Sequence, residues 1–399
     1  MVARLDTMNL SQVQGLPQEE TAFPRRFRNK NPLILRQIVS PSVLEQWSSH
    51  PEHVSQALNQ TASGAGASEG EEPLLPVMVA EDTKNFMDNP QFTKKIDMTA
   101  KEIVARVLLQ KQRREQEEAV MEVLVPQLEV LQKEQHQAQD DLMVAEEVAV
   151  SITSSASSSQ LSLVSAATIT STTTPTATEG PNICPLCENQ DIDNSNIDTH
   201  TTIQNRRFYY RGMVPTTLYD SLNIPALLTS LSLPQTTTSF ANAPNKDLMR
   251  IWVSLAGATT PLHYDRCHGI LIQLVGRKRF VVFSHEDTHG LYSYDGISGP
   301  GHASKVRGLG HCFPFPSLSA ESKDKEYQEH LEENMAEVQR RWPKIRNTTP
   351  WIVDLEPGDA LYTPPGFWHE VTSVDHSISI TVPWDMDADE LQSVPRHMI

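Results

Sequence analysis

A short polar run beside an apolar strand constrains this chain more than any other feature. Residues 259–265 read Thr-Thr-Pro-Leu-His-Tyr-Asp and lead into the apolar run 270–275. If the first run is extended, His263 and Asp265 point to the same face, because side chains on a β-strand alternate with a period of two. One strand then presents an imidazole and a carboxylate to the same point in space.

A second histidine follows a series of strand and turn signals later in the chain. Residues 351–355 and 360–363 are short apolar strands joined by a Pro-Gly turn, and a Pro-Pro-Gly corner then leads to His369 at the start of another strand. Two histidines and one carboxylate that leave positions open on a metal form the facial triad typical of non-haem iron(II) oxygenases. A lone His-x-Asp triplet is common on protein surfaces, so it is the context that predicts a metal site here.

The motifs around these residues resemble a known family. A Gly-Arg-Lys-Arg-Phe run, residues 276–280, follows the apolar strand, and a Trp-His pair ends the later series of turns. On these motifs the chain resembles the Jumonji-C, cupin-like family of 2-oxoglutarate-dependent oxygenases, and most of all its small hydroxylase branch. Strong motifs cover residues 250–283 and 351–384, and weaker similarity reaches back to Phe27. The resemblance implies a mainly β fold with peripheral helices, a double-stranded β-helix of the cupin or jelly-roll type.

The resemblance also assigns roles to individual residues. It implies that Fe(II) is held by His263, Asp265 and His369. It implies that Lys278 and Thr260 bind the distal carboxylate of 2-oxoglutarate, the co-substrate used with O2, and a lysine suits this role because a buried carboxylate needs a charged donor. In relatives a tyrosine on an earlier strand completes this pocket. Here it is Tyr210 or Tyr209, since a register shift of one residue swaps the two faces.

Two positions depart from the family pattern. Relatives often carry asparagine at the positions where this chain has Gly269 and Pro383. Both changes remove hydrogen-bond donors near the metal or the co-substrate. They therefore leave a catalytically inactive relative as an alternative, although no metal ligand is missing.

The charge balance argues against a nucleic acid or a membrane as the main partner. The 399 residues carry a formal net charge of −17 with a pI near 5.3, so no overall basic field exists. The cations nearest to the motif, Arg277 and Arg279, are expected to face away from Lys278 onto a solvated strand face. No apolar run is long enough to span a membrane and no signal-peptide pattern occurs, so we expect an intracellular protein, cytoplasmic or nuclear.

Composition also suggests how the chain is divided. A hydrophobic fraction of 38% is low for a fully packed chain of this length. We expect a disordered tail over residues 1–21 and a single Jumonji-C, cupin-like catalytic domain over 22–399, with its core at about 206–390. Charged helices and a Ser/Thr-rich linker at residues 111–205 are interpreted as an insertion into that domain.

Neither the cysteines nor the remaining histidines predict a second metal site. Cys184 and Cys187 form a Cys-x-x-Cys within the insertion, and with His200 as the nearest further ligand the set falls short of the four ligands of structural zinc. The four cysteines of the chain are expected to be reduced thiols. Four histidines in a Gly- and Pro-rich stretch lack paired spacing and are expected to be solvated: His285, His289, His302 and His311.

Local signals predict further elements. Strands are expected at residues 31–36, 74–80, 248–254 and 377–382, and helices at 41–47, 224–231 and 326–342. Ser40 is a possible N-cap for the first of these helices, and residues 50–72 are interpreted as a loop. Thr99 and Glu102 form a capping box that opens a further helix.

Three functions are compatible with the sequence. Hydroxylation of a protein side chain is favoured by the branch that the chain resembles and by its acidic charge. Hydroxylation of a tRNA base would need a local basic surface, and an inactive binding scaffold is the third possibility. Histone demethylation is less favoured, because no chromatin-reading segment is recognisable. We expect a protein substrate. We also expect a monomer, since few residues follow the last predicted strand.

Overall fold

The computed structural model describes residues 6–9, 27–61, 72–80, 93–108, 207–231, 244–297, 299–314 and 325–395. By their contacts the residues divide into two units, one made of Met1–Lys111 with Asn189–Ile399 and the other of Gln112–Glu188. Every described residue belongs to the first unit. The predicted insertion, with Cys184, Cys187 and His200, lies outside the described residues, as does most of the predicted tail.

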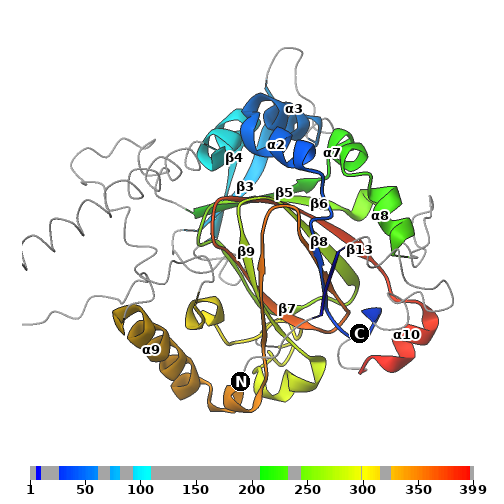
Figure 1. The fold of residues 1–399 in the computed structure, drawn as a ribbon. Helices are drawn as coiled ribbons and strands as arrows, with labels where there is room; N and C mark the ends of the chain where they lie inside the picture. The colour runs from blue at the N-terminus through cyan, green and yellow to red at the C-terminus, as the bar shows by residue number, and fades with distance from the viewer. Residues whose placement is uncertain are drawn as a thin grey trace, which may run out of the picture. The chain divides into compact units, whose positions relative to one another are not determined.

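Two β-sheets face each other in the described part of the chain (Figure 1). The large sheet has the strand order β1 (Thr7–Asn9), β2 (Leu33–Arg36), β11 (Ala360–Thr363), β8 (His268–Val275), β13 (Ser377–Trp384), β6 (Arg250–Ser254), β5 (Arg207–Met213), β3 (Leu74–Ala80) and β4 (Thr93–Thr99). The small sheet has the order β10 (Trp351–Leu355), β9 (Lys278–Phe283), β12 (Trp368–Ser373) and β7 (Thr259–Tyr264). From β6 to β13 the chain crosses repeatedly between the sheets, and the neighbours pair antiparallel. The predicted double-stranded β-helix is confirmed.

Apolar side chains fill the space between the two sheets. Along β9, Phe280 and Val282 belong to this inner core together with Leu361 of β11. The alternate residues Val281 and Phe283 belong to a separate core on the outer face of the small sheet. Each strand residue therefore faces either the barrel interior or its outer surroundings, and cross-strand partners share a face.

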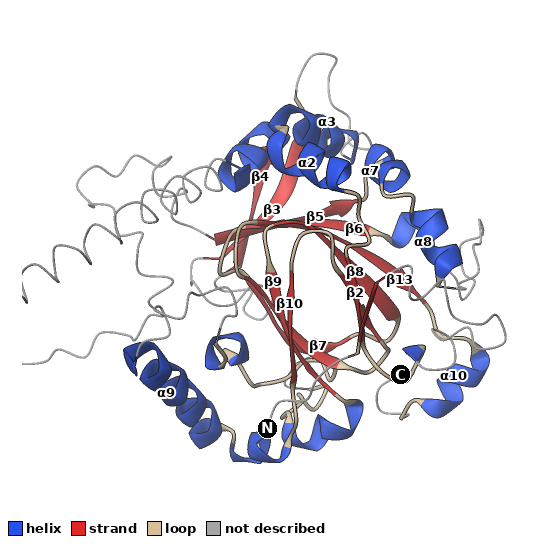
Figure 2. Ribbon diagram, in the orientation of Figure 1, coloured by secondary structure: helices blue, strands red, loops and turns tan. Residues whose placement is uncertain are grey.

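Helices cover the outer faces of both sheets (Figure 2). The large sheet is covered by α2 (Pro41–Ser49), α3 (Pro51–Thr61), a helix described over residues 100–108, α7 (Thr216–Ser221) and α8 (Ile224–Ser230). The small sheet is covered by α9 (Lys325–Arg341) and by the 3-10 helices η4 (His285–Gly290), η5 (Leu309–Cys312) and η6 (Pro343–Asn347). Two further helices flank large-sheet strands, η3 (Lys246–Leu248) before β6 and α10 (Ala388–Ser393) after β13. Within the described residues no helix is both long and apolar enough to cross a membrane.

Two sequence predictions about irregular segments are wrong. Residues 7–9, predicted to lie in a disordered tail, form β1 and pair in parallel with β2. Residues 51–61, predicted as part of a loop, form α3. In α3, Val54, Ala57 and Leu58 recur at helical spacing and are buried, and Pro51 is tolerated in the first turn.

The two predicted helix starts have different outcomes. The N–H of Thr99 donates to Oε2 of Glu102 at 2.8 Å, and the N–H of Glu102 donates to Oγ1 of Thr99 at 3.2 Å, so the capping box is confirmed. Ser40 occupies the N-cap position of α2, but its hydroxyl contacts that of Ser42 and caps no helix N–H. The other predicted strands and helices are confirmed and differ only at their ends.

Candidate metal centre

A bulge in β7 brings Thr260 and His263 to one side of the strand. Opposite them on β12, His369 pairs with His263 and Val371 pairs with Thr260, so β7 carries one residue more than its partner between the two pairs. Plain alternation would place residues three apart on opposite faces, and the extra residue returns them to the same face. Because Val371 packs on the inner core, this face is the barrel interior.

The Pro-Pro-Gly corner positions the second histidine. Gly366 has a φ of 77°, and the N–H of Phe367 donates to the carbonyl of Pro364 at 3.3 Å, which closes a tight turn just before His369. Glycine suits this position because it adopts positive φ without steric cost. The N–H of Gly366 also donates to the backbone oxygen of Asp265 at 2.9 Å. The two segments that carry candidate ligands are thereby joined.

Hydrogen bonds assign the ring nitrogens of both histidines. Nδ1 of His263 lies 2.7 Å from the carbonyl oxygen of Pro261, and Nδ1 of His369 lies 3.0 Å from that of Phe367. A carbonyl oxygen only accepts, so in the neutral rings each Nδ1 carries the proton and each Nε2 keeps a lone pair. This is the form of histidine that binds a metal through Nε2, with the other nitrogen fixed by a hydrogen bond.

The three predicted ligands meet at an end of the barrel that is open to solvent. Their ligand atoms all lie within 4.8 Å of one another, and Nε2 of His369 lies 3.7 Å from Oδ2 of Asp265. Burial and the neighbouring His369 lower the pKa of His263 to about 4, so the ring is neutral at physiological pH. The Asp265 side chain is 57% exposed. No other cluster of this kind occurs in the part of the chain that the structure describes. The donor set fits one divalent ion of the iron(II) type with open positions.

Lys278 lies on the inner wall with an ammonium group that is short of acceptors. It pairs with Leu355 and Ser373, and Leu355 belongs to the inner core. Its side chain is buried, and Nζ donates to Oγ of Ser379 at 3.0 Å with no other partner among the described residues. Burial lowers the pKa of Lys278 to about 8. Three N–H donors with one neutral acceptor leave room for a carboxylate ligand.

The structure places the two candidate tyrosines on opposite faces of β5. Tyr209 pairs with Ser254 and stacks on Trp252 with ring centroids 6.0 Å apart. Trp252 pairs with Ser379, the partner of the Lys278 ammonium, so Tyr209 shares the inner face. Tyr210 is buried in the outer core, with its hydroxyl 2.8 Å from that of Thr61. Only Tyr209 is therefore on the side of the candidate pocket.

The prediction that Arg277 and Arg279 lie on a solvated face is wrong. Arg279 does face away from Lys278, but it is fully buried and makes two 2.8 Å bonds to Asp354 of β10. It also donates to the carbonyls that follow η5. Arg277 is 17% exposed and pairs with Asp375 at 2.6 Å. Alternation correctly predicts that Arg279 faces away from Lys278. The residues near this strand in the sequence do not reveal that Asp354 and the segment after η5 cover the outer face.

The two departures from the family pattern face each other. Pro383 of β13 pairs directly with Gly269 of β8, and both share the inner face with Leu271, which packs on the inner core. A Cβ added to Gly269 would meet no atom within 4 Å. The wall is therefore open at this point, where relatives often carry a larger polar side chain.

Two residues near the centre make contacts that the sequence did not predict. Glu370, next to His369, is buried on the outer face and accepts the N–H of Gly310 at 2.7 Å, and burial raises its pKa to about 7. His302 is exposed, as predicted, but its carbonyl accepts the N–H of Tyr264 at 2.9 Å beside the triad. Neither contact has a local signal, because each joins segments far apart in the chain.

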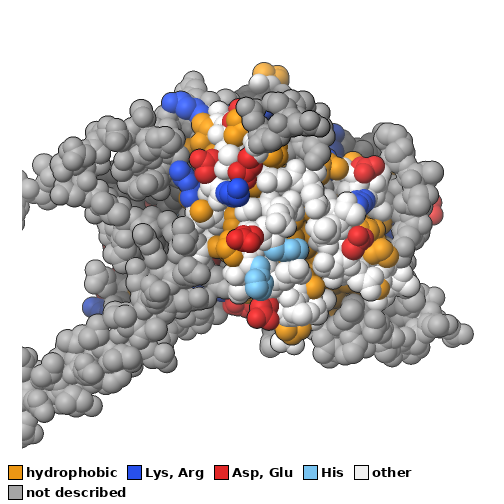
Figure 3. All heavy atoms as spheres, turned by 90° about the horizontal axis from the view of Figure 1, so that it is seen from above, with side chains coloured by type: hydrophobic (Ala, Val, Ile, Leu, Met, Phe, Trp, Pro, Cys, Tyr) orange, Lys and Arg blue, Asp and Glu red, His pale blue; other side chains and the backbone are white. Residues whose placement is uncertain are grey.

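The helices that cover the large sheet form a face with charges of both signs (Figure 3). Figure 3 looks onto the side of α2 and α3, where basic side chains stand apart and acidic side chains lie among them. A hollow on these helices is lined by Ser42, Glu45, Gln46, His50, Glu52, His53 and Gln56. On the described residues of this face no continuous basic patch forms.

Comparisons with known proteins find relatives that match part of this chain. Jumonji C domain-containing protein 5 of Drosophila melanogaster is 29% identical over 163 residues, which cover 41% of this chain and 34% of that protein. Lysine-specific demethylase 8 of Xenopus tropicalis is 26% identical over 161 residues, which cover 40% and 30%. The matches thus span about a third of these relatives. A solved structure described as YcfD, a ribosomal oxygenase from Escherichia coli, has 13% identity and a TM-score of 0.32, covering 95% of this chain and 54% of that one.

The family itself follows from a longer match. The profile of the cupin-like domain matches residues 189–390, just over half of the chain. This range contains every strand from β5 to β13 and all of the predicted site residues. The chain belongs to the Jumonji-C, cupin-like domain family.

Proposed function

We propose that this protein is an Fe(II)- and 2-oxoglutarate-dependent oxygenase that hydroxylates a protein side chain. The observation that carries the proposal is the presence, on one inner wall, of a triad with free Nε2 atoms and a buried lysine with a single hydroxyl partner. The triad fits an iron(II) ion. The lysine fits the distal carboxylate of 2-oxoglutarate.

The residues divide the work between the metal and the co-substrate. In this proposal the triad holds the metal, and Lys278 holds the far carboxylate with help from Thr260 on the same sheet and from Tyr209 on the inner face of the large sheet. Iron(II) with 2-oxoglutarate and O2 would supply the oxidation, in which the co-substrate becomes succinate and carbon dioxide and one oxygen atom enters a substrate C–H bond. Anchoring the distal end at Lys278 orients the co-substrate before reaction.

Two other substrates share this chemistry. Oxidation of an N-methyl carbon would release the methyl group, and a relative is named a lysine-specific demethylase. A tRNA base would need a basic surface, which the net charge of −17 does not favour. An inactive scaffold is motivated by Gly269 and Pro383, yet the triad and Lys278 are intact.

The test is succinate formation by the full chain with Fe(II) and 2-oxoglutarate. We expect turnover in the wild type and none in His263→Ala, which should keep its circular dichroism spectrum because the strands hold the barrel. Equal succinate in both proteins would contradict the triad, and no succinate or 2-oxoglutarate binding in the wild type would favour the scaffold. Mass spectrometry of captured proteins then separates a gained oxygen atom from a lost methyl group.

A further inference from the structure

We propose that Glu390 of α10 is a positioning residue for the candidate metal centre and acts on Asp265 through His268. The need for such a residue follows from Asp265 itself. Its side chain is 57% exposed, and its carboxylate accepts no hydrogen bond among the described residues. Its position therefore depends on the backbone, which the N–H of Gly366 holds at the Asp265 carbonyl oxygen and which the neighbouring residues hold at either side.

Buried residues hold that backbone on both sides. Tyr264, before Asp265, is 3% exposed and packs edge-on against Trp368 with ring centroids 4.7 Å apart. On the other side, β8 begins at the fully buried His268. Only residues 265–267 lie between the two strands. A displacement of His268 therefore passes to the ligand through two intervening residues.

His268 is fixed by three contacts. Its ring stacks on Trp384 with centroids 4.9 Å apart, Nδ1 lies 2.9 Å from the hydroxyl of Tyr362, and Nε2 lies 3.2 Å from Oε2 of Glu390. The Tyr362 hydroxyl accepts the N–H of Asn29 at 3.0 Å and can donate to Nδ1. Nε2 then carries the proton and donates to Glu390. Burial lowers the pKa of His268, which favours this neutral ring.

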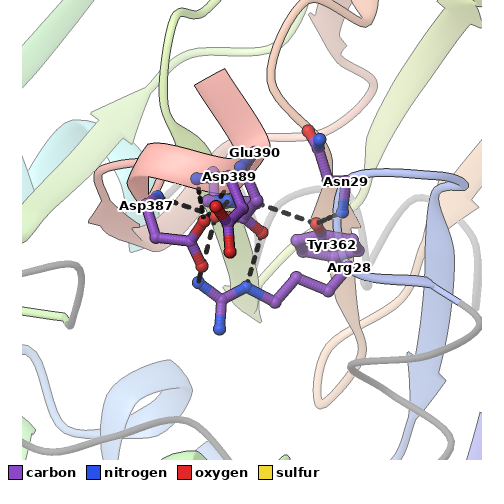
Figure 4. Close-up of polar contacts among 7 residues, drawn as sticks. Arg28, Asn29, Tyr362, Asp387, Asp389 and Glu390 are labelled. Atoms are coloured by element: carbon purple, nitrogen blue, oxygen red, sulfur yellow. Dashed lines mark hydrogen bonds and ion pairs between the residues drawn. The ribbon is translucent and has the colours of Figure 1, made fainter. Parts of the chain in front are cut away.

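Glu390 is in turn fixed by Arg28, which is far away in the chain, and by the N-cap of its own helix (Figure 4). Arg28 donates from Nε to Oε1 at 2.7 Å and from Nη2 to Oε2 at 3.0 Å, and the N–H of Asp387 donates to Oε2 at 2.9 Å. Burial would raise the pKa of Glu390, but the hydrogen bonds from His268 and Arg28 outweigh it and hold the pKa at about 2. An ionised acceptor with several donors is held in one place. Glu390 therefore offers His268 a fixed acceptor, at 3.2 Å from Nε2.

The experiment is a titration of the full chain with Co(II). Calorimetry measures the Kd, and the visible spectrum of the bound ion reports its ligands. In Glu390→Ala we expect the Kd for Co(II) to rise roughly three- to tenfold, less than the 10–100-fold typical when a residue bonded directly to a ligand is removed. The spectrum should change as well, because the Asp265 carboxylate moves. Asp389→Ala is the matched control, since this exposed residue lies in the same turn and its side chain forms no hydrogen bond or ion pair among the described residues.

Glu390→Gln separates positioning from simple stability. It keeps an acceptor for His268 but loses the charge that Arg28 pairs with, so its Kd should lie between those of the wild type and Glu390→Ala. If Glu390→Ala does not fold, the Kd of Glu390→Gln alone tests the proposal. The proposal would be overturned if Glu390→Ala had a lower melting temperature but bound Co(II) with the affinity and the spectrum of the wild type. The role of α10 would then be purely structural. A wild type that binds no Co(II) would instead remove the metal centre, and this proposal with it.

Discussion

Lys278 and Arg279 are neighbours in sequence and both are buried, yet their surroundings are opposite. Arg279, on the outer face of the small sheet, is matched by the Asp354 carboxylate and by backbone carbonyls. Lys278, on the inner face, has a single serine hydroxyl. A buried cation that its own chain satisfies is part of the fold, and its removal leaves its partners unpaired. A buried cation that its chain leaves short of acceptors indicates a place for a ligand.

The largest effect on stability is expected at Arg279. Arg279→Met leaves Asp354 without its partner and removes the donors that bind the carbonyls of Phe313 and Pro314. We expect the free energy of unfolding to fall by roughly 3–5 kcal/mol, as for other broken buried pairs. Urea denaturation followed by circular dichroism measures it. If Arg279→Met lowered the free energy of unfolding no more than the loss of an exposed ion pair does, Arg279 and Lys278 would not differ in their importance for stability.

The pH dependence of co-substrate binding should identify the lysine. Burial lowers the pKa of Lys278 from its usual value to about 8, so the free protein loses this positive charge as the pH rises through about 8. The affinity for 2-oxoglutarate should then fall by up to about tenfold per pH unit above that value. Calorimetric titration with 2-oxoglutarate and Mn(II) between pH 7 and 9 tests this, with Lys278→Met as the control that should show a flatter profile.

The smallest effect is expected at Arg277. Its ion pair with Asp375 is at the edge of the barrel and partly exposed, so Arg277→Ala should change the free energy of unfolding by about 1 kcal/mol or less. Because Arg277 is paired, the affinity for 2-oxoglutarate should stay near the wild-type value. A loss of 2-oxoglutarate binding in this variant would mean that net charge, rather than one anchored lysine, attracts the co-substrate.

Much of the fold and the triad could be predicted from periodicity and turn chemistry. The alternation of residues 377–382 and the Pro-Pro-Gly corner before His369 are local signals, and the structure has the strand and the turn at those places. The bulge in β7 was not predicted, because it shows only in the pairing with β12. The inward position of Thr260 was therefore implied by the family resemblance and not by alternation.

What could not be predicted depends on partners far along the chain. Arg279 was expected to be solvated, since nothing near it reveals that Asp354 and the segment after η5 cover it. His268 drew no attention for the same reason, because its partners Tyr362 and Glu390 lie on other elements. Alternation predicts which way a side chain points but not what it meets.

The most direct test is 2-oxoglutarate binding and stability measured together in Lys278→Met. If the lysine anchors the distal carboxylate, its loss leaves that charge buried and unpaired, at a cost of roughly 3–5 kcal/mol. The account then predicts that the Kd for 2-oxoglutarate rises at least about a hundredfold, given tenfold per 1.4 kcal/mol, while the free energy of unfolding is unchanged or higher. The account would be contradicted if Lys278→Met bound 2-oxoglutarate with an unchanged Kd and were destabilised as strongly as Arg279→Met.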